Sequence, residues 1–134
     1  MHKTKIVTVF LKNSNKILLL KRSQKVRSMK NLWAGISGKI EGNEIPLKRA
    51  YIEIYEEVGI KESNIKLLRE GEKISIESPQ YANHQWEVYP FLFLCDEIDV
   101  KLNWENSESK WIEINGLKNF TTVPSLDKVL SRLF

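Results

Sequence analysis

Three glutamates lie close together in this chain, at Glu53, Glu56 and Glu57, and Glu44 precedes them. Residues three and four apart are neighbours on a helix, so the three later glutamates should share one side of it. Like charges at this spacing repel by about 0.2–0.5 kcal/mol per close pair, and such a run is often only solvated surface. A bound cation would reverse the sign, and carboxylates without His or Cys suit Mg²⁺ or Mn²⁺.

A helix must position these carboxylates. Pro46 suits the first turn of a helix and Gly59 suits the residue after its end, which together predict a helix from about Leu47 to Val58. Apolar residues recur at helical spacing and predict the face that packs on the core. They are Leu47, Ala50, Tyr51, Ile54 and Val58.

The segment from Gly38 to Ile60 resembles the signature of the Nudix hydrolases, G-x5-E-x7-R-E-U-x-E-E-x-G-U, in which U is a bulky aliphatic residue. Eight of the nine fixed positions match the signature. They are Gly38, Glu44, Glu53, Ile54, Glu56, Glu57, Gly59 and Ile60. The exception is Ile52, which stands where the signature has Arg. Weaker similarity extends to the Trp33 turn before the signature and to Glu105-x-x-Glu108-x-x-Trp111 after it.

The resemblance implies an α/β fold, an α/β/α sandwich around a mixed β-sheet, in a single domain over residues 1–134. It also implies a divalent-metal-dependent hydrolase that cleaves a pyrophosphate linkage in a nucleoside diphosphate derivative, either a nucleotide or a nucleotide sugar. The main metal ligands would be Glu53 and Glu57, joined by Glu56 and the backbone carbonyl of Gly38. Glu44 would support the geometry of the loop and helix.

The departure at Ile52 affects the expected rate. In the family, the motif Arg pairs with carboxylates and orients the ligand glutamate, which Ile52 cannot do. Arg49 lies one turn before Glu53 on the same side of the helix and could compensate in part, although an Arg at another position rarely reproduces a fork geometry. We therefore expect slow hydrolysis, and a higher kcat when Ile52 is replaced by Arg.

The signature does not fix the general base. Glu105 is the favoured candidate and Glu108 the second, because both fall in the loop expected before Trp111. A solvated loop carboxylate is the alternative for each of them. Asp96, which follows the longest predicted strand, is one of several further acids in this part of the chain.

Candidate substrate contacts combine positive charge with aromatic faces. From Met1 to Ile40 the chain has ten Lys or Arg and no Asp or Glu, whereas the remainder has eleven basic and seventeen acidic residues. Positive potential beside an acidic metal site would attract phosphates, and exposed rings could stack on a base. The predicted contacts are Arg22, Lys39, Trp33 and Trp86, with Tyr81 and His84 as further aromatic candidates.

Apolar runs between turn residues predict the remaining elements. We expect a hairpin of strands 6–11 and 17–20, and short strands at 33–39, 66–68, 73–77 and 111–114. The longest strand should be 85–95, with a bend or bulge at Pro90. A last helix should span Leu126 to Leu133 with Ser125 as its cap, and the single cysteine, Cys95, should be buried.

Length and composition indicate an ordinary globular domain of 134 residues, 42% hydrophobic and 28% charged. No stretch approaches the roughly 18 apolar residues that span a membrane, so we expect no membrane partner and a cytoplasmic setting. The oligomeric state stays open, a homodimer included. Three functions also stay open: a hydrolase of small nucleotides, a Nudix-fold nucleotide-binding module with weak turnover, and, less favoured, an RNA-directed pyrophosphohydrolase.

Overall fold

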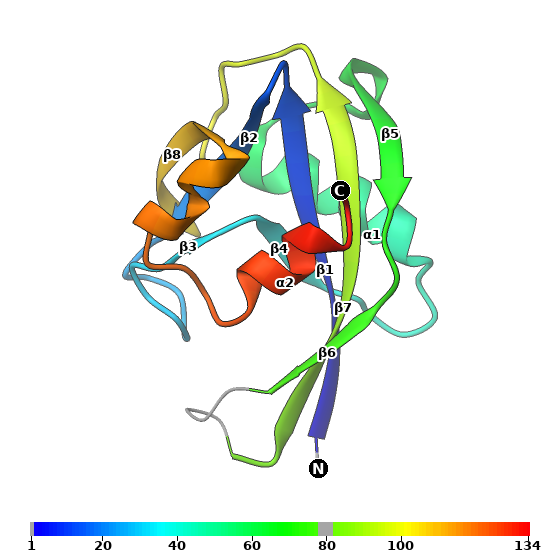
Figure 1. Cartoon of the computed structure of the whole chain (residues 1–134). Helices are drawn as coiled ribbons and strands as arrows, with labels where there is room; N and C mark the ends of the chain where they lie inside the picture. The colour runs from blue at the N-terminus through cyan, green and yellow to red at the C-terminus, as the bar shows by residue number, and fades with distance from the viewer. Residues whose placement is uncertain (1, 78–81) are drawn as a thin grey trace.

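A mixed β-sheet forms the centre of the protein in the computed structural model, which describes residues 2–77 and 82–134 (Figure 1). Its strands are β1 (His2–Asn13), β2 (Lys16–Arg22), β3 (Trp33–Ala34), β4 (Ile36–Lys39), β5 (Ile65–Glu70), β6 (Ile74–Glu77), β7 (His84–Cys95) and β8 (Asn106–Glu113). The central path runs β3-β2-β1-β7-β5, and β4, β6 and β8 pair with β1, β7 and β2. The β1–β7 pair is parallel, and the other pairs are antiparallel.

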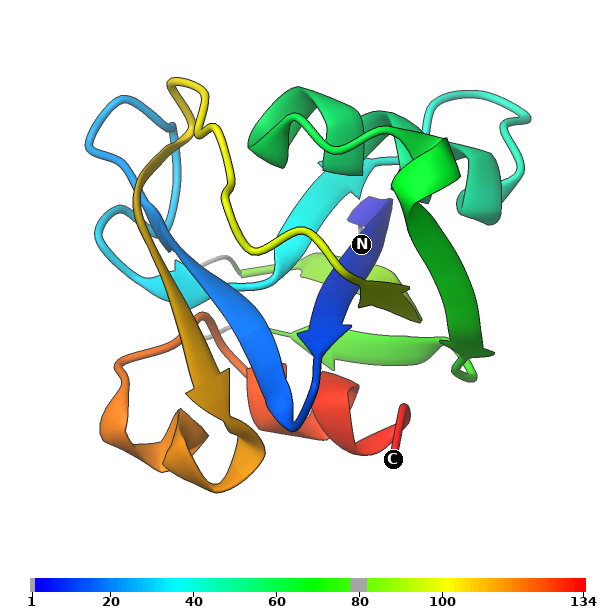
Figure 2. The ribbon, with the colours of Figure 1, turned by 90° about the horizontal axis from the view of Figure 1, so that it is seen from above.

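Helices cover both faces of this sheet, as Figure 2 shows. The helix α1 (Pro46–Val58) packs on one face, and α2 (Leu126–Ser131) lies on the other with the 3₁₀ helix η2 (Ile114–Asn119). Successive side chains of β1 point to opposite faces of the sheet and pack in both hydrophobic cores. Val9 and Leu11 belong to the cluster under α1, and Phe10 belongs to the cluster under α2. The expected α/β/α sandwich is therefore confirmed.

The predicted helix at the glutamates matches α1 closely. Pro46 is its first residue, one position earlier than expected, and the whole predicted apolar stripe packs in the core under it. Gly59 ends the helix with a left-handed φ of 73°, and its N–H donates to the carbonyl of Tyr55 (3.0 Å). A glycine suits this position because other residues rarely adopt a positive φ.

Pro90 marks a change of partner along β7. On its C-terminal side, β7 pairs with β5, and on its N-terminal side it pairs with β6. The chain passes between β5 and β6 opposite Pro90, where the N–H of Gly71 donates to the Pro90 carbonyl (2.9 Å). Since proline cannot donate to a ladder, it fits where the neighbouring strand is interrupted.

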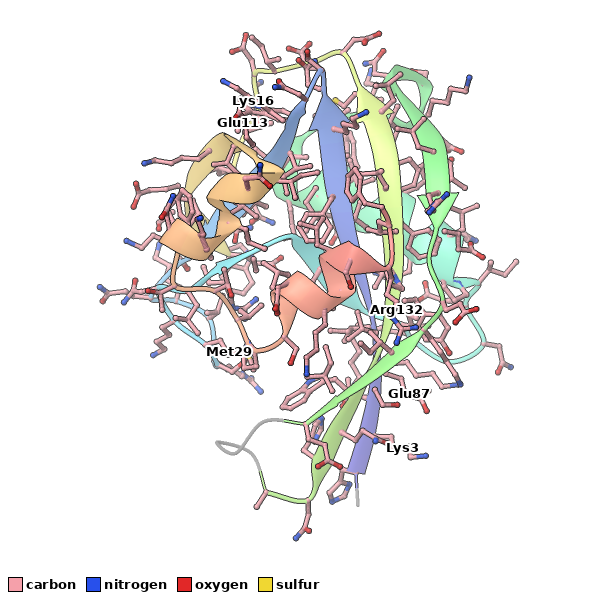
Figure 3. All side chains as sticks on the ribbon, viewed as in Figure 1. Lys3, Lys16, Met29, Glu87, Glu113 and Arg132 are labelled. Atoms are coloured by element: carbon pink, nitrogen blue, oxygen red, sulfur yellow. The ribbon has the colours of Figure 1, made fainter. Side chains whose placement is uncertain are left out.

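The strands β1 and β7 extend together beyond the helices to the N-terminal end of the chain (Figure 1). Side chains also link them there: Lys3 Nζ lies 4.0 Å from Glu87 Oε1 (Figure 3), and Thr4 Oγ1 lies 2.8 Å from His84 Nε2. This pairing fixes Trp86 opposite Thr4.

Several expected bounds need correction. The strand expected at 111–114 begins at Asn106, because β8 pairs with the full length of β2. The last helix ends at Ser131, and Ser125 precedes it without a capping hydrogen bond from its side chain. Cys95 is fully buried, as expected. No helix among the residues described is long and apolar enough to cross a membrane.

Candidate active site

An arginine on α1 joins two of the predicted glutamates. Arg49 donates from Nε to Oε1 of Glu44 (2.9 Å) and from Nη2 to Oε2 of Glu44 (2.6 Å). Its Nη1 donates to Oε2 of Glu53, 3.0 Å away. Glu44 also accepts a hydrogen bond from the backbone N–H of Glu41 (2.8 Å). These contacts fasten the loop before α1 to the first two turns of the helix.

Glu57 is more deeply buried than Glu53, with exposed fractions of the whole residue of 3% and 7%. Its Oε1 accepts a hydrogen bond from Nδ2 of Asn106, the first residue of β8, at 3.1 Å. Its Oε2 is buried and has no hydrogen-bond partner among the described residues. Leaving such an oxygen unpaired is costly, so a proton or a cation is expected at this atom.

Burial raises the pKa of both carboxyls. For Glu57 the pKa lies well above its usual value because the group is desolvated and because the Glu105 and Glu53 carboxylates repel its negative charge. The pKa of Glu53 is also raised by burial, against the opposing effect of its close approach to the Glu57 carboxyl and of the hydrogen bond from Arg49. A nearby cation would stabilise the ionised form of these two buried carboxyls, so the pair favours the binding of positive charge.

Gly38 leaves the space in which Glu53 lies. Gly38 belongs to β4 and pairs with Val7 of β1 at the centre of the sheet. A Cβ atom on Gly38 would overlap Cγ, Cδ and Oε2 of Glu53. The absence of a side chain at this position therefore determines where the Glu53 carboxylate can lie.

A tight turn before β8 presents Glu105 to the same region. The Glu105 N–H donates to Oδ1 of Asn103 (3.0 Å), and Nδ2 of Asn103 donates to Oε1 of Glu105 (3.3 Å). Ser23, just after β2, donates from its hydroxyl to the carbonyl of Trp104 (2.7 Å) and from its N–H to the carbonyl of Glu105 (2.8 Å). The half-buried Glu105 is thus held by contacts on both sides of the turn.

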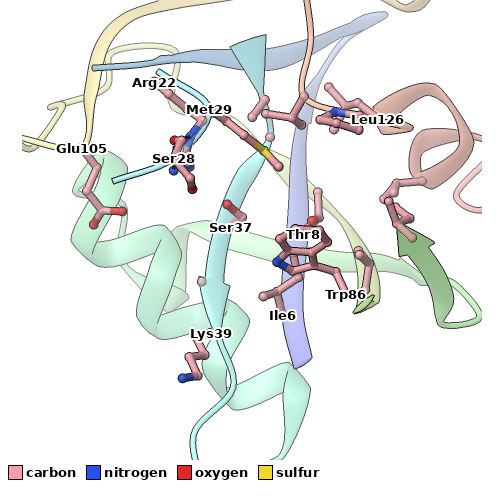
Figure 4. Close-up of a pocket in the computed structure, with 18 residues that line it drawn as sticks. Ile6, Thr8, Arg22, Ser28, Met29, Ser37, Lys39, Trp86, Glu105 and Leu126 are labelled. Carbon is pink, nitrogen blue, oxygen red and sulfur yellow. Dashed lines mark hydrogen bonds between the residues drawn. The ribbon is translucent and has the colours of Figure 1, made fainter. Parts of the chain in front are cut away.

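A cavity of about 290 Å³ opens beside these carboxylates (Figure 4). Glu105, Arg22 and Ser28 line one end of it, and Trp86 and Ile6 lie toward the other end. The volume is at the lower limit of typical small-molecule sites. The lining is polar at the end near Glu105 and apolar at the end where the indole ring of Trp86 lies.

Comparison with known proteins identifies the family. The family model described as "NUDIX domain" matches residues 2–133. The chain belongs to the Nudix hydrolase family. The Gly38–Ile60 segment that carries the acidic group is therefore its Nudix box.

Two relatives and one solved structure illustrate the relationship. This Nudix chain is 32% identical over 123 residues to the RNA pyrophosphohydrolase of Pelagibacter ubique, covering 81% of this chain and 75% of the relative. It is 29% identical over 94 residues to the dihydroneopterin triphosphate diphosphatase of Haemophilus influenzae, covering 69% and 56% of the two chains. The MutT protein of Methanosarcina mazei superposes with a TM-score of 0.76 at 22% identity, covering 98% of this chain and 92% of that one. The expected enzyme class, a pyrophosphohydrolase, is confirmed by the family and these relatives.

The donors of the Nudix box fit a hard divalent cation in chemistry. Glu57 offers a buried oxygen without a partner, and Glu53 lies in the space that Gly38 leaves open. Within residues 2–77 and 82–134, no three His, Cys, Asp or Glu side chains already converge tightly enough to hold an ion. Mg²⁺ commonly keeps several waters and takes only one or two carboxylates, so the pair Glu53 and Glu57 meets its needs.

Two predicted acids lie elsewhere than expected. Glu56 is exposed, whereas Glu53 and Glu57 are buried, so the three carboxylates do not share one environment. Glu108 is in β8 rather than in a loop, and its Oε2 lies 3.3 Å from Nζ of Lys21 on β2. Glu105 therefore lines the cavity, whereas Glu108 is exposed and pairs with Lys21 on the neighbouring strand.

The predicted substrate contacts divide between cavity and core. Arg22 and Lys39 line the cavity, and Arg22 donates from Nε and Nη2 to the carbonyl of Ser28 (3.2 and 3.1 Å). Trp33 packs edge-on against Phe120, with 5.2 Å between ring centroids, on the α2 side of the sheet. Trp33 is therefore half-buried against the core under α2, whereas the other two line the cavity.

Two of the remaining aromatic candidates, Trp86 and His84, lie near the N-terminal end of β7. Trp86 lines the cavity, and the ring of His84 lies 4.3 Å from it, centroid to centroid. His84 is half-buried in β7 rather than in a surface loop. Tyr81 lies outside the described residues.

Asn106, Asn103 and Ser23 are site residues that the sequence did not reveal. Each of them is a small polar residue with no signature of its own; Asn106 and Ser23 act through contacts across the fold, and Asn103 acts within the turn that holds Glu105. The only local signal is the position of Asn103 and Asn106 on either side of Glu105.

Proposed function

We propose that this enzyme uses Mg²⁺ or Mn²⁺ to cleave a pyrophosphate linkage in a nucleoside diphosphate derivative. The observation that carries the proposal is the buried pair Glu53 and Glu57, with one carboxylate oxygen unpaired, beside a cavity that has an indole at its far end. Its setting in the cytoplasm, its single-domain organisation and its oligomeric state stay predictions.

The cation would be held by Glu53 and Glu57, with Glu56 and the Gly38 carbonyl as further donors. When bound, it would neutralise the charge on the pyrophosphate oxygens. Arg49 and Asn106 keep the two buried carboxylates in place for this role. Glu56 must turn inward from its exposed position to take part, so its contribution is expected to be the smaller.

Glu105 is proposed as the general base. It lines the cavity, and its carboxylate is near enough to raise the pKa of Glu57 through repulsion. A carboxylate held by Asn103 and by the Ser23 contacts can accept a proton from the attacking water at a defined place. Lys39 and Arg22 would attract the phosphates, and Trp86 would contact the base or ribose.

An RNA 5′ end is the second candidate substrate. Lys25, Arg27 and Lys30 are exposed on the loop between β2 and β3, and Ser28 and Met29 of the same loop line the cavity. A relative is named an RNA pyrophosphohydrolase. Binding of a phosphate backbone by these residues would weaken steeply with salt.

A substrate panel tests the proposal. ADP-ribose, dinucleoside polyphosphates, nucleoside triphosphates and 5′-triphosphate RNA should be compared with Mg²⁺ and with chelator. We expect metal-dependent cleavage of at least one small nucleotide, with a KM that changes little between low and high salt. Preference for RNA with a steep salt dependence would favour the second candidate. Tight nucleotide binding without cleavage would instead indicate a binding module.

A rate assay with the best substrate of the panel also tests the role of Glu105 as general base. Glu105→Gln should lower kcat by about 100-fold or more, in the range typical of general acid–base catalysis. Glu108→Gln is the matched control, since Glu108 is exposed on β8 and pairs with Lys21 of the neighbouring strand. Equal losses in the two variants would contradict the assignment of Glu105.

A further inference from the structure

Arg49 occupies the centre of a three-residue contact that the Nudix signature does not contain. The signature places its Arg at position 52, which is Ile52 here. At 3.6 residues per turn, position 49 lies about 40° from Glu53 around the helix axis, whereas position 52 lies about 100° away in the same direction. Arg49 is therefore the better placed of the two to reach the Glu53 carboxylate.

The contacts of Arg49 have the geometry of a strong, directed interaction. Both oxygens of Glu44 accept from one guanidinium, at 2.9 and 2.6 Å, while the remaining Nη1 donates to Glu53 at 3.0 Å. The side chains are largely shielded, with exposed fractions of 14% for Arg49, 23% for Glu44 and 9% for Glu53. Bidentate, charge-assisted contacts of this kind fix orientation as well as distance.

Glu44 is itself anchored, which makes it a firm support for the arginine. Its Oε1 accepts from the Glu41 N–H in the turn that precedes α1. The chain of contacts therefore runs from the loop backbone through Glu44 and Arg49 to one oxygen of Glu53. Rotation of Glu53 away from the Gly38 space would break the last of these bonds.

We propose that Arg49 is the positioning residue of this active site and takes over, from one turn earlier, the role that the family assigns to Arg at position 52. This inference rests on the proposed function, because its consequence for catalysis passes through Glu53 as a metal ligand. The replacement at position 52 is then a relocation of the arginine within the helix. It removes the expectation, based on sequence alone, that Ile52→Arg would raise kcat, since Glu44 and Glu53 already have their partner.

Four variants test the proposal. Arg49→Lys keeps the charge but loses the fork, Arg49→Met removes both, Ile52→Arg adds the family residue, and Arg49→Met with Ile52→Arg moves the arginine to the family position. Mn²⁺ affinity by calorimetry and kcat and KM for the best substrate are measured for each. The metal-free melting temperature shows whether each variant is folded.

We expect Arg49→Lys and Arg49→Met to bind Mn²⁺ about 10–100-fold more weakly and to lose kcat by a similar factor, with KM nearly unchanged. Ile52→Arg should stay within about twofold of the wild type by the same measures, and the double variant should recover part of the loss in Arg49→Met. Wild-type Mn²⁺ affinity and kcat in Arg49→Lys, or a tenfold gain in Ile52→Arg, would overturn the proposal.

A metal-free measurement separates this inference from the proposed function. The Nε–H of Arg49 donates to Glu44, so its NMR signal should be shifted and slow to exchange in the protein without metal. The signal should persist in Ile52→Arg and be lost in Glu44→Ala, which removes the acceptor. Its absence from the wild type would refute the contact even in an active enzyme, whereas its presence in a protein that binds no metal would refute the proposed function alone.

Discussion

The Glu57→Gln variant should be more stable than the wild type without metal at pH 7, yet almost inactive. Glu57 is 3% exposed, and burial raises the pKa of its carboxyl well above the usual 4.5. Between 4.5 and the raised value the native protein binds more protons than the unfolded chain, so its stability falls as pH rises through this window. Glutamine keeps the acceptor for Asn106 and carries no charge, so it avoids this loss.

Turnover should respond in the opposite direction. Losing one ligand charge of the proposed metal site should cost at least about 100-fold in kcat, as loss of an electrostatic stabiliser commonly does. Melting curves without metal from pH 5 to 8 and a rate assay with Mg²⁺ measure both effects. Glu70→Gln, an exposed change on β5, is the matched control. Wild-type rates in a folded Glu57→Gln protein would refute the mechanism.

The Gly38→Ala variant should lose metal affinity while retaining its fold. The added methyl group would overlap the side chain of Glu53, which must then leave its position against β4. A displacement of about 1 Å at a reacting group can cost on the order of 100-fold in rate, and we expect a loss of that size in kcat. Calorimetry with Mn²⁺ and a rate assay check the two consequences.

Gly116→Ala provides the control for this substitution. A Cβ on Gly116 meets no atom within 4 Å, so the same chemical change should leave metal binding and rate intact. Wild-type Mn²⁺ affinity in Gly38→Ala would show that the Glu53 carboxylate is not held where the structure has it.

Local rules account for much of what the sequence predicted correctly. Pro46 and Gly59 bound α1 because one lacks an N–H that the first turn does not need and the other tolerates a positive φ. The burial of Cys95 and the strand at 85–95 follow from a long apolar run. These features depend on residues near each other in the chain, so a single sequence contains the information.

The corrections concern the direction in which side chains point. At 100° per residue, Glu53 and Glu57 are about 40° apart and flank the apolar stripe, whereas Glu56 is displaced by about 100° from Glu57 toward solvent. Spacing of three and four residues predicted neighbours but not which of them would be buried. Trp33 was expected to contact substrate and packs on Phe120, a partner 87 positions later whose location depends on the whole fold.

The contacts that support the site could not be predicted from the sequence either, because they depend on how distant segments pack together. Asn106 reaches Glu57 only because β8 pairs with β2 and begins beside α1. Arg49 could be placed on the correct side of the helix, but its fork with Glu44 depends on the path of the loop before Pro46. The sequence thus predicted the type of site, and the tertiary structure supplied its internal support.

Calorimetric titration of the wild-type protein with Mg²⁺ and with Mn²⁺ tests the central claim most directly. We predict saturable binding that raises the melting temperature with metal concentration, because a ligand that binds only the folded state stabilises it. The binding should be lost in Glu57→Gln, where the unpaired carboxylate oxygen is replaced. If neither metal binds, with or without nucleotide, the acidic pair Glu53 and Glu57 is not a metal site and the proposed mechanism is wrong.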